Sequence, residues 1–251
     1  AFSVVDERAS GISDRPIPEC QKCHLSATCL PEVVGQSDAR LLSILVHTNR
    51  TYRPGDYLYR AGDGFQKLFI VKSGSVKTTS ISGVSMISEQ VLRFHLPGDA
   101  LGLDAVAGMC HPTSAVALEK TVCCEIPFVR LEQMASTHPR LQGYVYGLLS
   151  GGVVQANAAM ALLGLFNATQ RVTAFMLELS RRLERRELCE TVFRMSMSRA
   201  EIASHLGLAT ETVSRALARL HDDGLISVEG KNIALLDLQG LEAILVVHGR
   251  E

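Results

Sequence analysis

The stretch SRAEIASHLGLATETVSRALARLHDDGLISVEGKNIALL, residues 198–236, decides the fold of the C-terminal part of the chain. The run Ser198–Glu201 has the spacing of a capping box and begins a helix, which Gly207 ends. After a short turn, Thr210 is placed to cap a second helix that runs to about Asp223. The letters LISVEGKNIALL then predict two strands joined by a turn at a glycine. Together these elements predict a winged helix-turn-helix.

The second of these helices has two opposed faces, at about 100° per residue. One face is apolar and is expected to pack into the core: Val213, Ala216, Leu217 and Leu220. The other face is compact and mostly polar: Glu211, Ser214, Arg215 and Ala218. Arginine can bond guanine in bidentate fashion, glutamate can accept from cytosine, and serine can do either. We therefore predict that residues 168–251 bind double-stranded DNA, with Glu211, Ser214 and Arg215 as the base readers, rather than forming an ordinary surface helix.

Bulk charge gives this prediction no support, so it rests on local placement. The formal net charge is −1, and residues 168–251 hold 11 Lys and Arg against 12 Asp and Glu. A helix predicted over residues 168–187 ends in four arginines, namely Arg181, Arg182, Arg185 and Arg186. These arginines either form a solvated helix end favoured by the helix dipole or contact phosphates.

The segment before this domain, residues 138–167, predicts a long helix with no charged residue between Arg140 and Arg171. A seam with 4-3-4-3 spacing runs along it: Leu149, Val153, Ala156, Met160 and Leu163. An uncharged helix must be covered on most sides, so we expect one side on the preceding domain and the other on a partner subunit. A core helix of a monomer is the alternative. Polar residues such as Gln155 and Asn157 argue against a membrane span.

Residues 31–137 contain short β-rich runs separated by turn residues, such as Pro54-Gly55-Asp56 and Pro97-Gly98-Asp99. This pattern is typical of a small barrel or jelly roll. The fold class is therefore α+β: an N-terminal segment over 1–30, a sensor barrel over 31–137, a dimerisation helix over 138–167 and the DNA-binding domain.

The composition is ordinary for a soluble protein, with 47% hydrophobic and 20% charged residues. The first ten residues lack a basic segment followed by an apolar one, so we expect no signal peptide and a cytoplasmic protein. In that reducing compartment the seven cysteines favour metal or redox chemistry over a disulfide framework.

Three cysteines lie close together as Cys20-x2-Cys23-x5-Cys29, and with one distant cysteine they supply four thiolates. Four thiolates suit either a [4Fe–4S] cluster or a tetrahedral zinc ion, and spacing alone leaves both open. On an alternating strand Cys124 points with Val122 and Ile126, whereas Cys123 points with Glu125. We expect the remaining two cysteines, Cys110 and Cys189, to be small buried hydrophobes.

The chain resembles the cyclic-AMP receptor protein superfamily, and within it the oxygen-responsive fumarate-and-nitrate-reduction (FNR) regulators. The resemblance extends from about Cys20 to Leu238. The segments that match are CQKCHLSATC, FHLPGD followed by LGLDA, ALEKTVCCEIPF, LSRR and TETVSRALARL.

The resemblance implies a [4Fe–4S] cluster, a homodimer, and control of genes for low-oxygen metabolism, with activation through RNA polymerase. It places the cluster on Cys20, Cys23, Cys29 and the cysteine before Glu-Ile-Pro, which is Cys124. The adjacent Cys123 departs from the family pattern, but the dry, packed wall that a cluster needs also favours Cys124. The family's E-x-x-S-R motif reads palindromic sites with TGA half-sites, and its positions here are Glu211, Ser214 and Arg215.

Three alternatives remain. One is a zinc-binding or thiol-redox regulator of the same fold. Another is a cyclic-nucleotide-responsive regulator, which the resemblance disfavours because Thr113 stands where those proteins place a phosphate-binding arginine. The third is an enzyme on a cupin-like barrel. We expect no enzyme, because His47, His95 and His111 are scattered and no nucleophile–base pattern is present.

Overall fold

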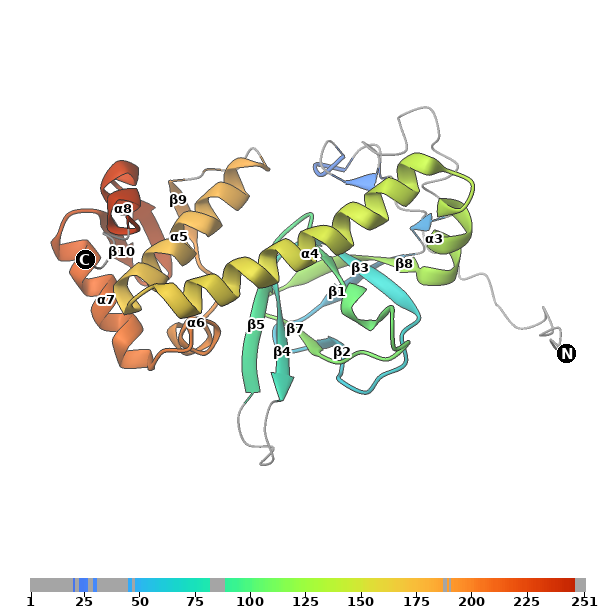
Figure 1. The fold of residues 1–251 in the computed structure, drawn as a ribbon, viewed down its shortest axis with the longest axis horizontal. Coiled ribbons are helices and arrows are strands. Elements are labelled where there is room, and N and C mark those ends of the chain that lie inside the picture. Colours follow the sequence, from blue (N-terminus) through green and yellow to red (C-terminus); the bar gives the residue numbers. More distant parts are fainter. Residues whose placement is uncertain are drawn as a thin grey trace, which may run out of the picture.

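A computed structural model describes residues 20, 23–26, 29–30, 45–46, 48–81, 89–186, 189 and 191–246. Figure 1 shows a β-domain, a long helix that runs past it, and a C-terminal domain at the far end of that helix. Of the predicted N-terminal segment, residues 1–19 lie outside the described residues.

The β-domain consists of two four-stranded antiparallel sheets, which confirms the predicted jelly-roll barrel. One sheet has the order β1-β8-β3-β6 and the other β2-β7-β4-β5. Its described strands are β1 (Thr48–Tyr52), β2 (Tyr57–Tyr59), β3 (Lys67–Ser73), β4 (Val76–Ile81), β5 (Glu89–His95), β6 (Ala100–Leu101), β7 (Ser114–Ala117) and β8 (Thr121–Pro127). The turn from β3 to β4 requires Gly74, since φ is 79° there and a Cβ atom would lie 2.6 Å from the Lys120 carbonyl oxygen.

The 3-10 helix η2 (Leu103–Ala105) lies between β6 and β7, and α3 (Phe128–Ala135) and the 27-residue α4 (Pro139–Leu165) lead out of the barrel. Pro139 suits the first turn of α4 because its missing N–H would have no partner there. Leu141 is buried against the barrel side, whereas most of the following residues of α4 are exposed within one chain. The expected packing of α4 on the barrel is therefore limited to its first turns.

The C-terminal domain has the predicted winged helix-turn-helix. Its elements are α5 (Ala168–Glu184), β9 (Val192–Arg194), α6 (Arg199–Leu206), α7 (Thr210–Asp222), β10 (Ile226–Glu229), β11 (Asn232–Leu235) and α8 (Leu238–Ile244). Ser198 and Glu201 form the predicted capping box of α6. Two details differ from expectation: Ala209, not Thr210, is the N-cap of α7, and β9 adds an unpredicted third strand to the wing.

The barrel and the C-terminal domain share one hydrophobic core. Val91, Phe94 and Leu96 of the β5 region belong to the same buried cluster as Phe175 of α5 and Ile202 of α6. The rings of Phe94 and Phe175 meet edge to face with their centroids 5.9 Å apart. Because this apolar contact is continuous, the two domains are held as one body rather than joined only by α4.

Buried ion pairs reinforce the same contact. Asp99, in the turn after β5, accepts hydrogen bonds from Arg182 of α5 and, at 2.6 Å, from Arg186, just beyond the end of α5. All three side chains are only 12% exposed. Burial alone would raise the pKa of Asp99, but the neighbouring guanidinium groups, led by Arg182, hold it below its ordinary value. For these two arginines, both expectations were wrong: they are neither a solvated helix end nor exposed phosphate ligands.

Helix α4 is long and apolar enough to cross a bilayer by length and composition, despite its polar residues. The domains at its two ends nevertheless touch each other beside it. In addition to the Asp99 pairs, the Ser75 hydroxyl donates to the Ser196 hydroxyl at 2.6 Å. A hydrocarbon layer of about 30 Å could not separate domains in such contact.

The Asp99 contact predicts that Asp99→Asn lowers the free energy of unfolding by about 3–5 kcal/mol, since two arginines stay buried without their anion. Asparagine can still accept the Leu96 N–H in the turn, so the loss reports on charge. A folded pKa below the unfolded value gives stability that is present at neutral pH and disappears as the pH falls through the folded pKa.

Chemical denaturation at neutral and acid pH measures both effects. The control is Glu242→Gln, which removes an Arg181 ion pair whose side chains are 55% and 56% exposed, and it should change stability by less than about 1 kcal/mol. Equal effects of the two variants would contradict a structural role for the buried pairs.

Candidate metal centre and DNA-reading helix

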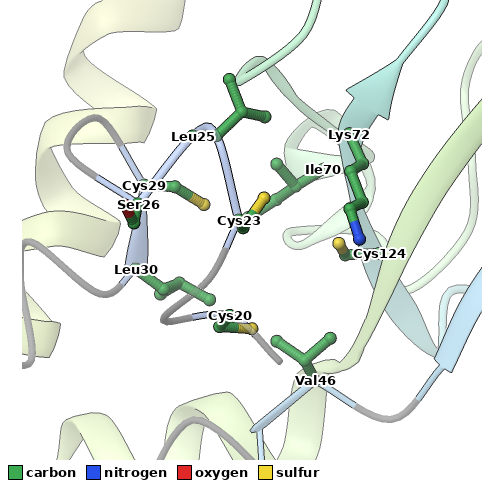
Figure 2. Close-up of a pocket in the computed structure, with 10 residues that line it drawn as sticks. All are labelled: Cys20, Cys23, Leu25, Ser26, Cys29, Leu30, Val46, Ile70, Lys72 and Cys124. Atoms are coloured by element: carbon green, nitrogen blue, oxygen red, sulfur yellow. The ribbon is translucent and has the colours of Figure 1, made fainter. Parts of the chain in front are cut away.

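Four cysteines line one cavity on the outer face of the barrel (Figure 2). Cys20, Cys23 and Cys29 come from the N-terminal segment, and Cys124 comes from β8. The rest of the lining is mainly apolar, with one ammonium group: Leu25, Ser26, Leu30, Val46, Ile70 and Lys72. The structure thus brings together the four cysteines singled out as metal ligands.

The described part of the cysteine run is shaped by local hydrogen bonds, and Leu30 at its end packs into the core. The Cys23 and Ser26 amides donate to the carbonyl oxygens of Cys20 and Cys23, at 3.2 and 2.9 Å. Leu30 is 1% exposed and packs in a cluster that includes Leu141 of α4. The cysteine run therefore lies between the barrel and the start of α4.

Strand β8 separates the two adjacent cysteines by the alternation that the sequence predicted. Cys123 is fully buried inside the barrel, in the cluster that contains Tyr52 and Phe69. Cys124 points outward into the cavity, and its thiol donates to Asn49 Oδ1 at 3.1 Å. Cys123 is thus the more deeply buried of the two, so the expectation that dryness favours Cys124 was wrong. Cys124 is distinguished instead by the direction of its side chain, which points into the cavity.

Burial raises the pKa of Cys29 to about 11 and that of Cys124 to about 12, and nearby cysteines add to both increases. The Cys29 and Cys124 thiols are therefore protonated at neutral pH unless a cation binds and releases the protons. Among the described residues, no three Cys, His, Asp or Glu side chains are grouped closely enough to hold a single ion. The four thiols surround a space rather than converge on one point.

The two other cysteines differ from expectation. Cys110 and Cys189 are both exposed, so they do not act as small core hydrophobes. Cys110 forms an isolated β-bridge with Gly64, and Cys189 lies between α5 and β9. Neither lines the cavity.

Helix α7 presents the predicted pair of faces. Val213, Ala216, Leu217 and Leu220 are its buried residues. Glu211, Arg215 and Ala218 are exposed and Ser214 is half-buried, so the polar patch faces away from the core. The left-handed Gly207 ends α6 and sets the turn between the two helices. This geometry leaves the first turns of α7 open to a major groove.

The proposed seam on α4 is exposed within one chain. Val153 is 62% and Met160 64% exposed, Leu149 and Leu163 are 38% and 37% exposed, and Ala156 is also open. Arg171, which in the sequence marks only the end of the uncharged segment, joins this helix to the DNA-binding domain. Its guanidinium donates to the carbonyl oxygens of Leu163 at 2.6 Å and Leu206 at 3.2 Å.

Thr113, the position at which the family resemblance places a phosphate-binding arginine, is paired with an acid in this chain. The Thr113 hydroxyl donates to the Asp104 carboxylate at 2.8 Å, which places an anion there instead of a cation. Tyr59 and His111 stack nearby with ring centroids 3.8 Å apart. A cyclic phosphate would meet negative charge at this position.

Comparisons with known proteins agree with this architecture. Residues 49–138 match the family model of the cyclic nucleotide-binding domain, and residues 170–244 match the Crp-like helix-turn-helix domain. The chain is 39% identical over 218 residues to the transcriptional activator protein Anr of Pseudomonas protegens, covering 87% of this chain and 88% of that protein. It is 34% identical to the fumarate and nitrate reduction regulatory protein of Salmonella typhimurium, covering 90% and 89%. The solved structure of FixK2 from Bradyrhizobium japonicum is 31% identical, with a TM-score of 0.73 over 80% of this chain and 98% of that one.

Arg215→Ala should weaken binding to a specific operator by about 1–3 kcal/mol and relax preference at one G·C pair in each half-site. Arg219→Ala is the matched control, because that exposed arginine lies one turn further along α7 and carries the same charge. It should weaken binding to specific and random DNA about equally. Titrations with the operator, its single-base variants and a random duplex distinguish the two variants. If Arg215→Ala weakened binding to specific and random DNA equally, Arg215 would not be a base-reading residue.

Proposed function

Because the chain belongs to the cyclic-AMP receptor protein and FNR family of transcription regulators, we propose that it is an oxygen-responsive member that binds a [4Fe–4S] cluster. As a homodimer it binds palindromic DNA with TGA-containing half-sites and controls genes for low-oxygen metabolism in the cytoplasm. The observation that supports this proposal best is the cavity that Cys20, Cys23, Cys29 and Cys124 line together.

These residues fit a cluster by their chemistry and by their arrangement. Thiolates are the usual ligands of iron–sulfur clusters, and the remaining wall is mainly apolar. Each thiolate of such a cluster binds a separate iron atom, so the four sulfur atoms must surround a space, as they do here. The bound cluster supplies the oxygen-sensitive chemistry, and the four cysteines with the apolar wall hold it and limit the access of water.

A zinc-binding or thiol-redox regulator is the second candidate, because four thiolates can also hold zinc. It would use the same cysteines and the same DNA-binding domain. The cyclic-nucleotide alternative is less well supported, since Thr113 stands at the position of the family's phosphate-binding arginine and is hydrogen-bonded to the acid Asp104.

The cysteine run is in a position to influence α4 directly. Leu30 shares a buried cluster with Leu141, and Tyr144 of α4 packs against the same cluster. Ligation would fix Cys29 next to Leu30, and loss of ligation would loosen this contact with the start of α4. We propose that α4 carries the dimer interface, with Leu149, Val153, Ala156, Met160 and Leu163 facing their copies.

The dimer accounts for the apolar surface of α4, and a two-fold axis matches a palindromic operator. Glu211, Ser214 and Arg215 would read each half-site from the exposed face of α7. Activation of transcription requires contact with RNA polymerase, which we include as a proposed partner.

Protein purified without air should contain about four irons per chain. Replacing Cys20, Cys23, Cys29 or Cys124 by serine should each abolish the cluster, because each removes one of its four ligands. Iron and sulfide analysis with a visible spectrum, before and after air, measures this.

The matched control is Cys123→Ala, which removes the adjacent thiol without placing a hydroxyl in the barrel interior. It should keep the cluster, as should Cys110→Ser and Cys189→Ser. If Cys123→Ala lost the cluster and Cys124→Ser kept it, Cys123 and not Cys124 would be the fourth ligand. A colourless wild-type protein that contains zinc would favour the second candidate.

Ala156→Asp should raise the dimer dissociation constant at pH 7 by at least about tenfold, which is 1.4 kcal/mol. A two-fold axis brings both new carboxylates together in a partly dry seam, where charges without partners cost several kcal/mol. Their repulsion raises the carboxyl pKa, so mild acid should protonate them and partly restore the dimer.

Ala158→Asp is the control, since Ala158 lies on the opposite face of α4 and is also exposed. Analytical ultracentrifugation of both variants compares them. Equal dimerisation of wild type and Ala156→Asp at pH 7 would place Ala156 outside the interface.

A further inference from the structure

The cysteine cavity contains one ionic side chain, that of Lys72. It is the single Lys, Arg, Asp or Glu in the described lining, and Figure 2 shows its ammonium group extended toward Cys124. Within the described part of the chain no carboxylate pairs with it, whereas Lys67 and Lys77 each have an acidic partner. An ammonium group at a set of thiols, with no acidic partner among the described residues, requires an explanation.

The backbone explains why Lys72 points into this cavity. On β3, Ile70 pairs directly with Cys124, and the register shifts between Val71 and Ser73. Alternate residues along a strand point to the same face of the sheet, and this alternation holds from Ile70 to Lys72. Ile70 and Lys72 therefore reach the same cavity from the strand beside Cys124, and Val71 points into the barrel.

The electrostatics of the thiols agree with this placement. Burial raises the pKa of Cys20 and Cys124, and the neighbouring cysteines raise it further. Lys72 opposes both increases, so its charge acts on ligands from both parts of the site, the N-terminal run and β8.

We propose that Lys72 is the charge-compensating residue of the cysteine site, and that its ammonium group sets how readily the loaded site loses an electron. This inference rests on the proposed function. A cluster with four thiolate ligands has a net negative charge, and a buried negative charge is unfavourable without a cation nearby. When dioxygen takes one electron from the loaded site and becomes superoxide, the site gains one positive charge. Lys72 opposes that gain by repulsion.

The direction of the effect follows from this charge balance. Removing the ammonium group favours the more oxidised, less negative state, so it lowers the reduction potential. At an effective dielectric of about 20, two charges a few ångströms apart interact strongly enough for a tenfold change in the redox equilibrium. A tenfold change corresponds to about 59 mV for one electron.

The test compares the cluster-loaded wild type with Lys72→Met, Lys72→Arg and Lys120→Met, all prepared without air. Lys72→Met should lower the midpoint potential by about 59 mV. It should also shorten the cluster's lifetime in air about tenfold, by the same charge argument. Lys72→Arg keeps the charge and should stay near wild type. Lys120 is exposed in the turn before β8 and lies away from the cavity. Lys120→Met makes the same change in net charge as Lys72→Met and should have little effect on either property.

The outcomes separate this inference from the proposed function. A wild-type protein that assembles no iron–sulfur cluster would overturn both. A loaded Lys72→Met protein with the potential and air lifetime of wild type would overturn the role of Lys72 alone. If Lys72→Met folds, as judged by circular dichroism, but cannot load a cluster while Lys72→Arg can, the need for the charge is supported.

Discussion

The contact between β5 and α5 is the interaction on which the rest of this fold depends. Phe94 and its neighbours form one core with Phe175. At the edge of that core, Asp99 accepts hydrogen bonds from Arg182 and Arg186. Apolar burial supplies attraction without direction, whereas the buried ion pairs define a geometry, because an unpaired charge there would be costly. The DNA-binding domain is thereby held in one orientation beside the barrel.

Strand β8 supports two separate functions through side-chain alternation. Its inward residues, such as Cys123, complete the barrel core, and its outward residue Cys124 completes the cysteine cavity. A shift by one residue would exchange the two thiols and disrupt both environments. The same outer wall carries Lys72, two residues after Ile70 on β3, so the sheet also sets the charge of the cavity.

Helix α4 connects the two ends of the molecule and leaves an apolar surface open. Its start packs near Leu30 and the cysteine run, and its end is joined by Arg171 to Leu206, the last residue of α6. Under the proposed function, a change in how Leu30 packs near Leu141 would reach the DNA-reading helix through α4. The exposed seam between these ends is where a second subunit would act on both.

The sequence by itself determined the local elements: the capping box at Ser198, the two faces of α7, the turn-separated strands of the barrel and the cysteine spacing all follow from periodicity and cap chemistry. Local rules placed the start of α7 one residue from its observed N-cap and missed β9, whose pairing depends on the distant β11. Only the tertiary structure decided that Arg182 and Arg186 meet Asp99, that Lys72 enters the cavity, and that Cys110 is exposed. These outcomes depend on side chains far apart in the chain, and no local pattern encodes which distant partner a charged group or a thiol will face.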